Sequence, residues 1–167
     1  MWHTLFVILH AGTATLALLA GLVALRAGRA FEVYRWSLVG MTAFLVPALV
    51  AGWGGFATAA RVVFLALLGL AAVMVHRAVA AGRLLPRDTG GPTGPYLDHV
   101  GFTLISLTDG FAVVAVLRAG APAWLIAVIG IGIAVAGHVA LESAKRRLAR
   151  PPAVAAVMMR RPAASRQ

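Results

Sequence analysis

The chain has 167 residues, enough for one compact domain but not for two. Hydrophobic residues make up 61% of it and charged residues only 12%, about half of the charged fraction (~25%) of an ordinary soluble domain. Too few polar side chains are present to cover a water-facing surface, so lipid must face much of the protein. There is no cysteine, which excludes disulfides, thiolate metal sites and cysteine nucleophiles.

Five stretches are long and apolar enough to cross a bilayer, which takes about 20 residues of helix. In chain order they are residues 5–25, 36–53, 60–80, 99–117 and 122–141. The first is too long for a signal peptide and no positive charge precedes it, so it is predicted to be a retained span. Pro47 predicts a kink in the second stretch, and Pro122 opens the fifth. Short links at 54–58 and 118–122 predict two antiparallel hairpins.

The predicted fold class is therefore all-α: a polytopic membrane helix bundle of five transmembrane helices, covering residues 1–147. Residues 148–167 are rich in Ala, Arg and Pro and are predicted to form a basic, disordered tail. The tail is expected either to lie on anionic lipid or to act only as a determinant of topology. The Gly- and Pro-rich segment 82–97 is interpreted as a linker, because it lacks the Lys-Ser/Thr pair and helix of a phosphate-binding loop.

The net charge of +10 follows the topology, so no nucleic-acid partner is expected. Thirteen of the 15 Lys and Arg residues fall at or after the ends of spans one, three and five; the exceptions are Arg61 and Arg118. The positive-inside rule then places the N-terminus outside and the C-terminus in the cytoplasm. The aromatic residues expected at the outer interface are Trp2, Trp53 and Trp124, and those expected at the inner interface are Tyr34, Trp36 and Tyr96.

Histidines inside the spans are candidates for function, because polar side chains are costly in lipid. His76, His99 and His138 fall in the cytoplasmic leaflet on three helices, and His10 falls in the outer leaflet. Small residues flank His76 and His138, so these two are predicted to ligate the iron of a b-type haem, with His99 and His10 as further cofactor-binding candidates. The alternatives are close helix packing or a catalytic or proton-relay role. No sequence spacing supports a zinc site of His76, His99 and His138.

Asp109 is the only acidic residue deep in a span, and it belongs to a polar stripe. His99, Thr103, Ser106 and Asp109 recur at three- and four-residue spacing, so they share one face of the fourth span. This face is the predicted polar intramembrane site, which either binds a quinone-like or other polar ligand or relays protons. The structural alternative is that Asp109 forms a hydrogen bond or ion pair with an inward group.

The stretch 98–111, Asp-His-Val-Gly-Phe-Thr-Leu-Ile-Ser-Leu-Thr-Asp-Gly-Phe, resembles the His-led helix of an uncharacterised family of bacterial predicted multi-span membrane proteins. The motifs His10-x-Gly12 and Tyr34-Arg35-Trp36-x-x-x-Gly40 are similar to the same family, which usually carries His-Arg where this chain has Tyr34-Arg35. The resemblance covers most of residues 5–145 and implies a protein of the bacterial cytoplasmic membrane. The family's activity is unassigned, and its histidine placement is distantly similar to that of small b-type cytochromes.

Three hypotheses about function follow. The first is a small haem-b electron-transfer subunit that passes electrons between a quinone and a redox partner subunit, with His76 and His138 as iron ligands. The second is a non-enzymatic membrane subunit or small transporter, in which the histidines and Asp109 line a polar intramembrane pathway. The third is an intramembrane acid–base enzyme with Asp109 as the acid and His99 as the base. The sequence leaves open whether the protein is an enzyme.

Overall fold

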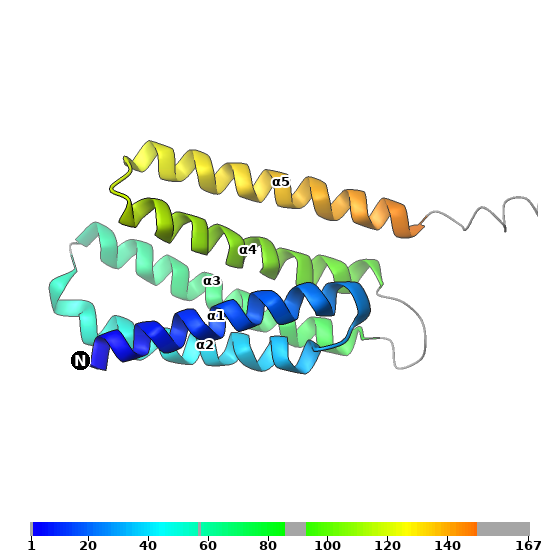
Figure 1. The fold of residues 1–167 in the computed structure, drawn as a ribbon, viewed down its shortest axis with the longest axis horizontal. Coiled ribbons are helices and arrows are strands. Elements are labelled where there is room, and N and C mark those ends of the chain that lie inside the picture. Colours follow the sequence, from blue (N-terminus) through cyan, green and yellow to red (C-terminus); the bar gives the residue numbers. More distant parts are fainter. Residues whose placement is uncertain (1, 57, 86–92, 150–167) are drawn as a thin grey trace, which may run out of the picture.

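The computed structural model describes residues 2–56, 58–85 and 93–149, which contain helices and no strand. The elements are α1 (Trp2–Ala27), α2 (Phe31–Gly52), the short 3₁₀ turn η1 (Trp53–Gly55), α3 (Thr58–Arg83), α4 (Gly94–Arg118) and α5 (Ala123–Ala149). All five α-helices are long and apolar enough to cross a membrane, and they lie alongside one another (Figure 1). The prediction of an all-α membrane bundle with five spans is confirmed.

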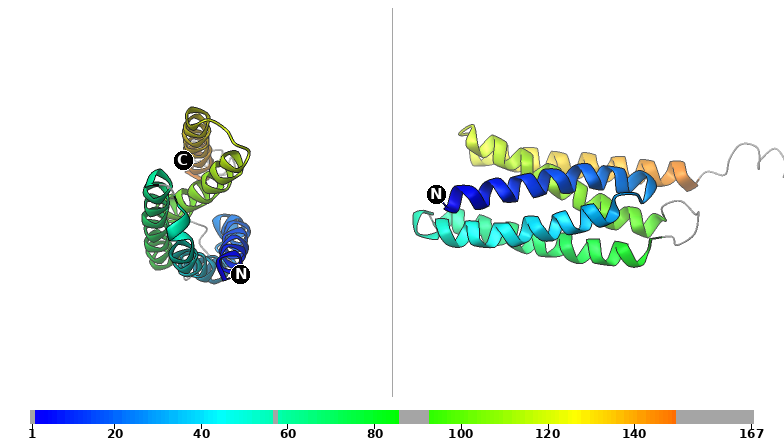
Figure 2. Two further views of the ribbon diagram at one scale, coloured as in Figure 1. Left: turned by 90° about the vertical axis from the view of Figure 1, so that its left-hand side faces the viewer. Right: turned by 60° about the horizontal axis from the view of Figure 1, so that its bottom comes forward.

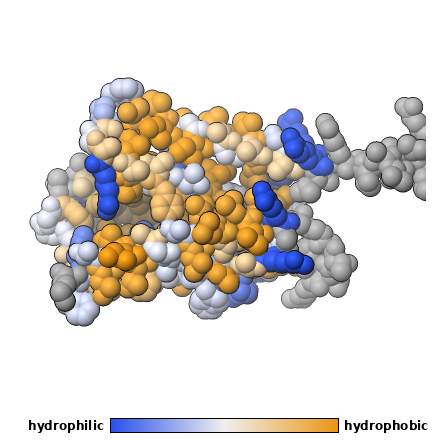
Figure 3. All heavy atoms as spheres, in the orientation of Figure 1, coloured by the Kyte–Doolittle hydropathy of each residue, from blue (hydrophilic) through white to orange (hydrophobic). Residues whose placement is uncertain are grey.

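The two ends of the bundle differ in charge. Trp2 and the α2–α3 and α4–α5 connections lie at one end, called here the N-terminal end; the α1–α2 connection and Ala149 lie at the other, the C-terminal end (Figure 1). The N-terminal end carries Arg61 and Arg118. The described cations of the C-terminal end are Arg26, Arg29, Arg35, Arg77, Arg83, Lys145, Arg146 and Arg147. Between the ends the surface in Figure 3 is mainly hydrophobic, as expected of a surface that lipid covers.

The helices extend beyond their predicted spans. Backbone hydrogen bonds continue past the apolar stretch until the chain turns. Two of these turns contain glycines in the left-handed region, Gly28 (φ 64°) after α1 and Gly120 (φ 76°) after α4, a conformation that favours glycine. α2 continues through Pro47 to Gly52, as membrane helices tolerate when neighbours satisfy the freed backbone groups.

The predicted linker at 82–97 is shorter than expected. α3 runs to Arg83, and α4 already begins at Gly94, with Pro95 in its first turn, where the missing N–H of proline has no cost. Residues 86–92, the centre of the linker, lie outside the described residues. α5 continues to Ala149, so it includes the first two residues of the predicted tail, and the tail from residue 150 also lies outside the described part.

The core forms where α1, α2 and α4 meet. The inward residues of α1 are small and recur at three- and four-residue spacing; they are Ala14, Ala17, Ala20, Gly21 and Ala24. A Cβ added to Gly21 would lie 2.7 Å from Leu104 of α4 and 2.9 Å from Tyr34 of α2. Small residues of this kind let helix backbones approach closely in a membrane. As a result α4 lies in the middle of the bundle, in contact with α1, α3 and α5 (Figure 2).

The contact between α4 and α5 also depends on glycines. A Cβ on Gly101 of α4 would lie 2.6 Å from Leu141 of α5, and a Cβ on Gly137 of α5 would lie 2.5 Å from Ile105 of α4. Each helix thus inserts one branched side chain over a glycine of the other. We call these four residues the glycine seam. Because α5 packs mainly on α4, the seam holds α5 in place.

Gly137→Ala is expected to destabilise the protein by about 1–3 kcal/mol, the usual cost of overpacking a filled position. The nearest Ile105 atom, Cγ1, is close to that residue's backbone and cannot swing away easily. The measurement is unfolding in mixed detergent micelles, followed by circular dichroism. Gly132→Ala on the same helix is the matched control, because a Cβ there meets nothing within 4 Å. Equal stability of the two variants would contradict the seam.

Candidate functional site

The four polar residues of the fourth span lie along α4, where it packs against its neighbours. Thr103 is fully buried, and His99, Ser106 and Asp109 are half-buried. The Thr103 hydroxyl donates a hydrogen bond to the His99 carbonyl oxygen at 3.1 Å, a common way to satisfy threonine inside a helix. From His99 to Asp109 the stripe covers roughly 15 Å of the helix axis. We call His99, Thr103, Ser106 and Asp109 the polar track.

Asp109 lies at the end of the polar track nearest the middle of the membrane. Its Oδ1 is buried and has no hydrogen-bond partner among the described residues. The same atom lies 3.3 Å from the point that a Cβ on Gly130 of α5 would occupy, so glycine at 130 leaves room beside the carboxylate. No Lys, Arg or His in the described part forms an ion pair with Asp109. The predicted structural role, an ion pair or hydrogen bond to an inward group, therefore has no support at Oδ1.

Two more buried polar atoms have no hydrogen-bond partner among the described residues. They are Nδ1 of His99 and the hydroxyl oxygen of Tyr34, which lies near Thr103 without completing a hydrogen bond. A buried polar group without a partner typically costs about 1–3 kcal/mol. The described residues contain four such side-chain atoms, and Arg61 Nε is the only one away from the polar track and its neighbour Tyr34. Three of the four buried polar atoms that lack a partner in the described part therefore lie on the polar track or next to it.

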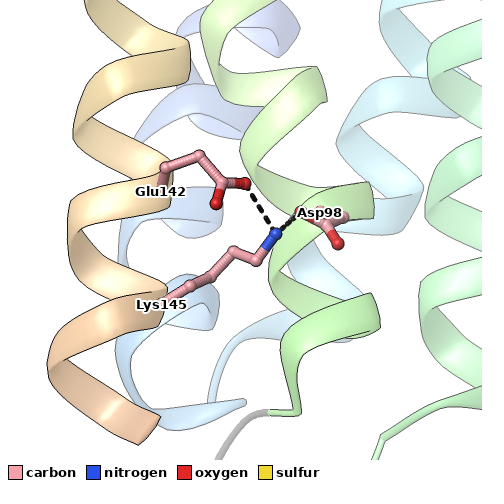
Figure 4. Close-up of polar contacts among 3 residues, drawn as sticks. All are labelled: Asp98, Glu142 and Lys145. Atoms are coloured by element: carbon pink, nitrogen blue, oxygen red, sulfur yellow. Dashed lines mark hydrogen bonds and ion pairs between the residues drawn. The ribbon is translucent and has the colours of Figure 1, made fainter.

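Charged side chains meet where the polar track reaches the C-terminal end. The Nζ of Lys145 on α5 donates to Asp98 Oδ1 of α4 at 2.8 Å and to Glu142 Oε1 of its own helix at 2.7 Å (Figure 4). Asp98 precedes His99 directly, so this network lies next to the first residue of the track. Sequence reasoning missed it, although the tight hairpin at 118–122 supplies a signal: residues at similar separations on its two sides, such as 98 and 145, lie near each other.

The two predicted haem ligands lie apart from the core. His76 on α3 and His138 on α5 are both exposed, and α3 and α5 each pack against α4. Both imidazoles lie on the surface of the bundle and not in its core, and their ligation of a haem iron stays a prediction. His99 is on the third helix, α4, and the described residues contain no group of three His, Asp or Glu side chains that could hold a metal ion. Zinc binding by His76, His99 and His138 thus finds no support.

His10 forms a contact between the first two helices. Its Nδ1 donates to the main-chain oxygen of Met41 in α2 at 2.9 Å, and the ring is half-buried. The contact is on α1, away from the polar track. It gives His10 a structural partner in the α1–α2 hairpin, while its predicted cofactor role stays a prediction.

Two of the predicted interfacial aromatic residues belong to the core. Tyr34 and Tyr96 are both 0% exposed, whereas Trp36 is 63% exposed. The Tyr96 hydroxyl donates to the main-chain oxygen of Ala24 at 3.0 Å and so ties α4 to α1. Both tyrosines lie in the first turn of their helices, at the C-terminal end of the bundle, and face inward with the buried stripe, so their predicted depth at the inner interface stays a prediction.

No protein-family model matches this chain, and neither the curated proteins nor the solved structures include a match to it. Its function must be inferred from the side chains that the bundle places together. Of these, the polar track has the most buried polar atoms without partners.

Tyr96→Phe is expected to destabilise the protein by about 0.5–1.5 kcal/mol, the net worth of one buried hydrogen bond. Tyr34→Phe is the matched control, because it removes the same atom from an equally buried ring whose hydroxyl has no partner. It is expected to be neutral or stabilising. Unfolding in mixed micelles compares the two, and a loss in Tyr34→Phe as large as that in Tyr96→Phe would contradict the assignment of the hydroxyls.

Proposed function

We propose that the protein is a small membrane transporter that moves protons along the polar track of α4. The observation that carries the proposal is that Asp109 Oδ1 and His99 Nδ1, both on this track, are buried and have no hydrogen-bond partner among the described residues. Carboxyl and imidazole groups bind and release protons, and membrane proton relays are built from Asp, Glu and His. The hydroxyls of Thr103 and Ser106 lie between them at steps of roughly 4.5–6 Å along the axis.

The C-terminal end of the polar track supports the same function. His99 follows Asp98, which shares Lys145 with Glu142, and all three of these charged groups are partly exposed. Protons from the aqueous side therefore have titratable groups beside the mouth of the track. At the other end, Gly130 leaves space next to the Asp109 carboxylate, which gives this group freedom to reorient between protonation states.

The separation of the two titratable groups favours transport over acid–base catalysis. A general acid and a general base that act on one substrate must both come within hydrogen-bond reach of its reacting atoms, about 2.6–3.2 Å. Asp109 and His99 are roughly 15 Å apart along one helix. They suit two stations of one pathway better than the two halves of one catalytic site.

Asp109→Asn is expected to reduce proton flux by about tenfold or more, because the amide fills the same space but cannot carry the proton. The measurement uses the purified chain in phospholipid vesicles that contain a pH-sensitive dye, with a potassium diffusion potential as the driving force. Glu32→Gln is the control: it removes a carboxylate that pairs with Arg35 on the surface, outside the track. Wild-type flux equal to that of protein-free vesicles, or unchanged flux in Asp109→Asn, would refute the proposal.

We also propose that the C-terminal end of the bundle faces the cytoplasm of a bacterial cell and that the chain resides in its cytoplasmic membrane. The support is the unequal charge of the two ends. A fluorescent protein fused after Gln167 is then expected to fluoresce, and alkaline phosphatase at the same position to be inactive. The reverse pattern would invert the topology and would move Lys145 and its carboxylate partners to the outside.

A second candidate function, electron transfer through haem b, is favoured by the open positions of His76 and His138, which leave both rings free for a ligand shared with a redox partner subunit or a quinone-linked complex. When bound, haem supplies one-electron chemistry. A reduced-minus-oxidised visible spectrum of the protein, expressed with adequate haem, decides between the two candidates. The absence of Soret and α bands removes the haem candidate, and bands that survive both His76→Ala and His138→Ala exclude these ligands.

A further inference from the structure

An apolar groove lies between α2 and α3 near the N-terminal end of the bundle. It has a volume of about 370 Å³, and its walls are the side chains of Val46, Leu49, Val50, Trp53, Leu65 and Leu68. Every one of these residues is apolar or aromatic. From Val46 to Trp53 the groove follows α2 and its continuation for roughly 10 Å. It therefore has the elongated, apolar character of a site for a hydrocarbon chain.

A cation stands at one end of this groove. Arg61 is on α3, four residues before Leu65 and seven before Leu68, so the three share one helix face. Its guanidinium carbon lies 5.5 Å from the centroid of the Trp53 ring, which places the charge over a residue that lines the groove. Nε of Arg61 is buried and has no hydrogen-bond partner in the described part of the chain, where no acidic residue forms an ion pair with Arg61 either.

The chemistry of this pair of features matches one class of ligand. A phospholipid has an apolar chain and an anionic phosphate joined by a short linkage, and a bilayer holds the chain parallel to the helices with the phosphate at the interface. Arginine binds phosphate strongly, because its planar fork presents several N–H donors. Tryptophan is favoured at the same depth of the membrane. The groove supplies the apolar surface and Arg61 the unpaired donors.

We propose that the α2–α3 groove is a binding site for one anionic phospholipid, with an acyl chain between the two helices and the phosphate on Arg61. An acidic headgroup fits better than a zwitterionic one, because no carboxylate in the described part lies within ion-pair range of Arg61 to receive an ammonium group. The site is on α2 and α3 and uses no residue of the polar track, so it stands independently of the proton-transport proposal.

The test is native mass spectrometry of the full chain, released from nanodiscs that contain phosphatidylglycerol and phosphatidylethanolamine at one to three. The wild type is expected to keep one phosphatidylglycerol molecule through detergent release and to enrich it several-fold over its share of the nanodisc. Arg61→Gln is expected to lose this enrichment. Arg118→Gln is the matched control, because it removes the other cation of the N-terminal end, which lies at the end of α4 and not on either helix of the groove, and it is expected to behave as the wild type.

A second variant tests the groove itself. Leu65 is 53% exposed, so Leu65→Trp can fold while it fills the space of the acyl chain, and it is expected to lose the bound lipid although Arg61 is intact. Unchanged retention in both Arg61→Gln and Leu65→Trp would overturn the proposal, and so would equal losses in Arg61→Gln and Arg118→Gln. A dimer that forms in the wild type and disappears in Leu65→Trp, without bound lipid, would assign the groove to a second copy of the chain instead.

Discussion

Close packing over small residues holds α4 in the middle of the bundle, and the rest of the structure depends on it. Lipid is as apolar as the helices, so the hydrophobic effect gives little drive for one helix to contact another, and van der Waals fit must supply it. Gly21 admits Leu104 on one side of α4, and Gly137 admits Ile105 on another. With neighbours on three sides, α4 is the helix that can carry a polar track shielded from hydrocarbon. A chain with alanines at these glycines would separate its helices and expose Asp109 to lipid.

Hydropathy in the sequence was enough to predict the number of spans, because each long apolar stretch became one helix. Rotation about the helix axis decides which side chains face the core, and hydropathy alone does not give it. On α3 the buried residues are Ala71, Met74, Ala78 and Ala81, a stripe at three- and four-residue spacing. His76 is two residues from both Met74 and Ala78, about 200° around the helix, and so points away from the core. The small residues that were read as room for a cofactor, Gly69, Ala72 and Ala80, share the exposed face of His76 and not the buried stripe.

The same comparison explains the tyrosines. The rule that aromatic residues collect at membrane interfaces placed Tyr34 and Trp36 together, although they are two residues apart and must point in different directions. Phe31, Tyr34, Leu38 and Met41 form the buried stripe of α2, and Trp36 is off it. Helical periodicity therefore predicts burial better than residue type does in this chain. The polar stripe of α4 was found from the sequence for this reason: it was identified by spacing, and its members are buried or half-buried.

The ionisable residues of the described part fall into two groups, those that form an ion pair and those that form none. The chain has five acidic residues and 15 Lys and Arg residues, so cations are abundant. Of the four acidic residues in the described part, Glu32 pairs with Arg35, and Asp98 and Glu142 share Lys145; all of these pairs are at the C-terminal end.

Asp109 is the one acidic residue of the described part that forms no ion pair. The position of α5 beside its carboxylate is Gly130, which carries no charge. Arg61, at the N-terminal end of the bundle, also forms no ion pair with a described residue, and it lies beside the apolar groove. The two proposals use the two charges that have no ion-pair partner among the described residues, with a proton at Asp109 and a lipid phosphate at Arg61. The two lie on different helices, so each can be removed without the other, and their roles can be separated.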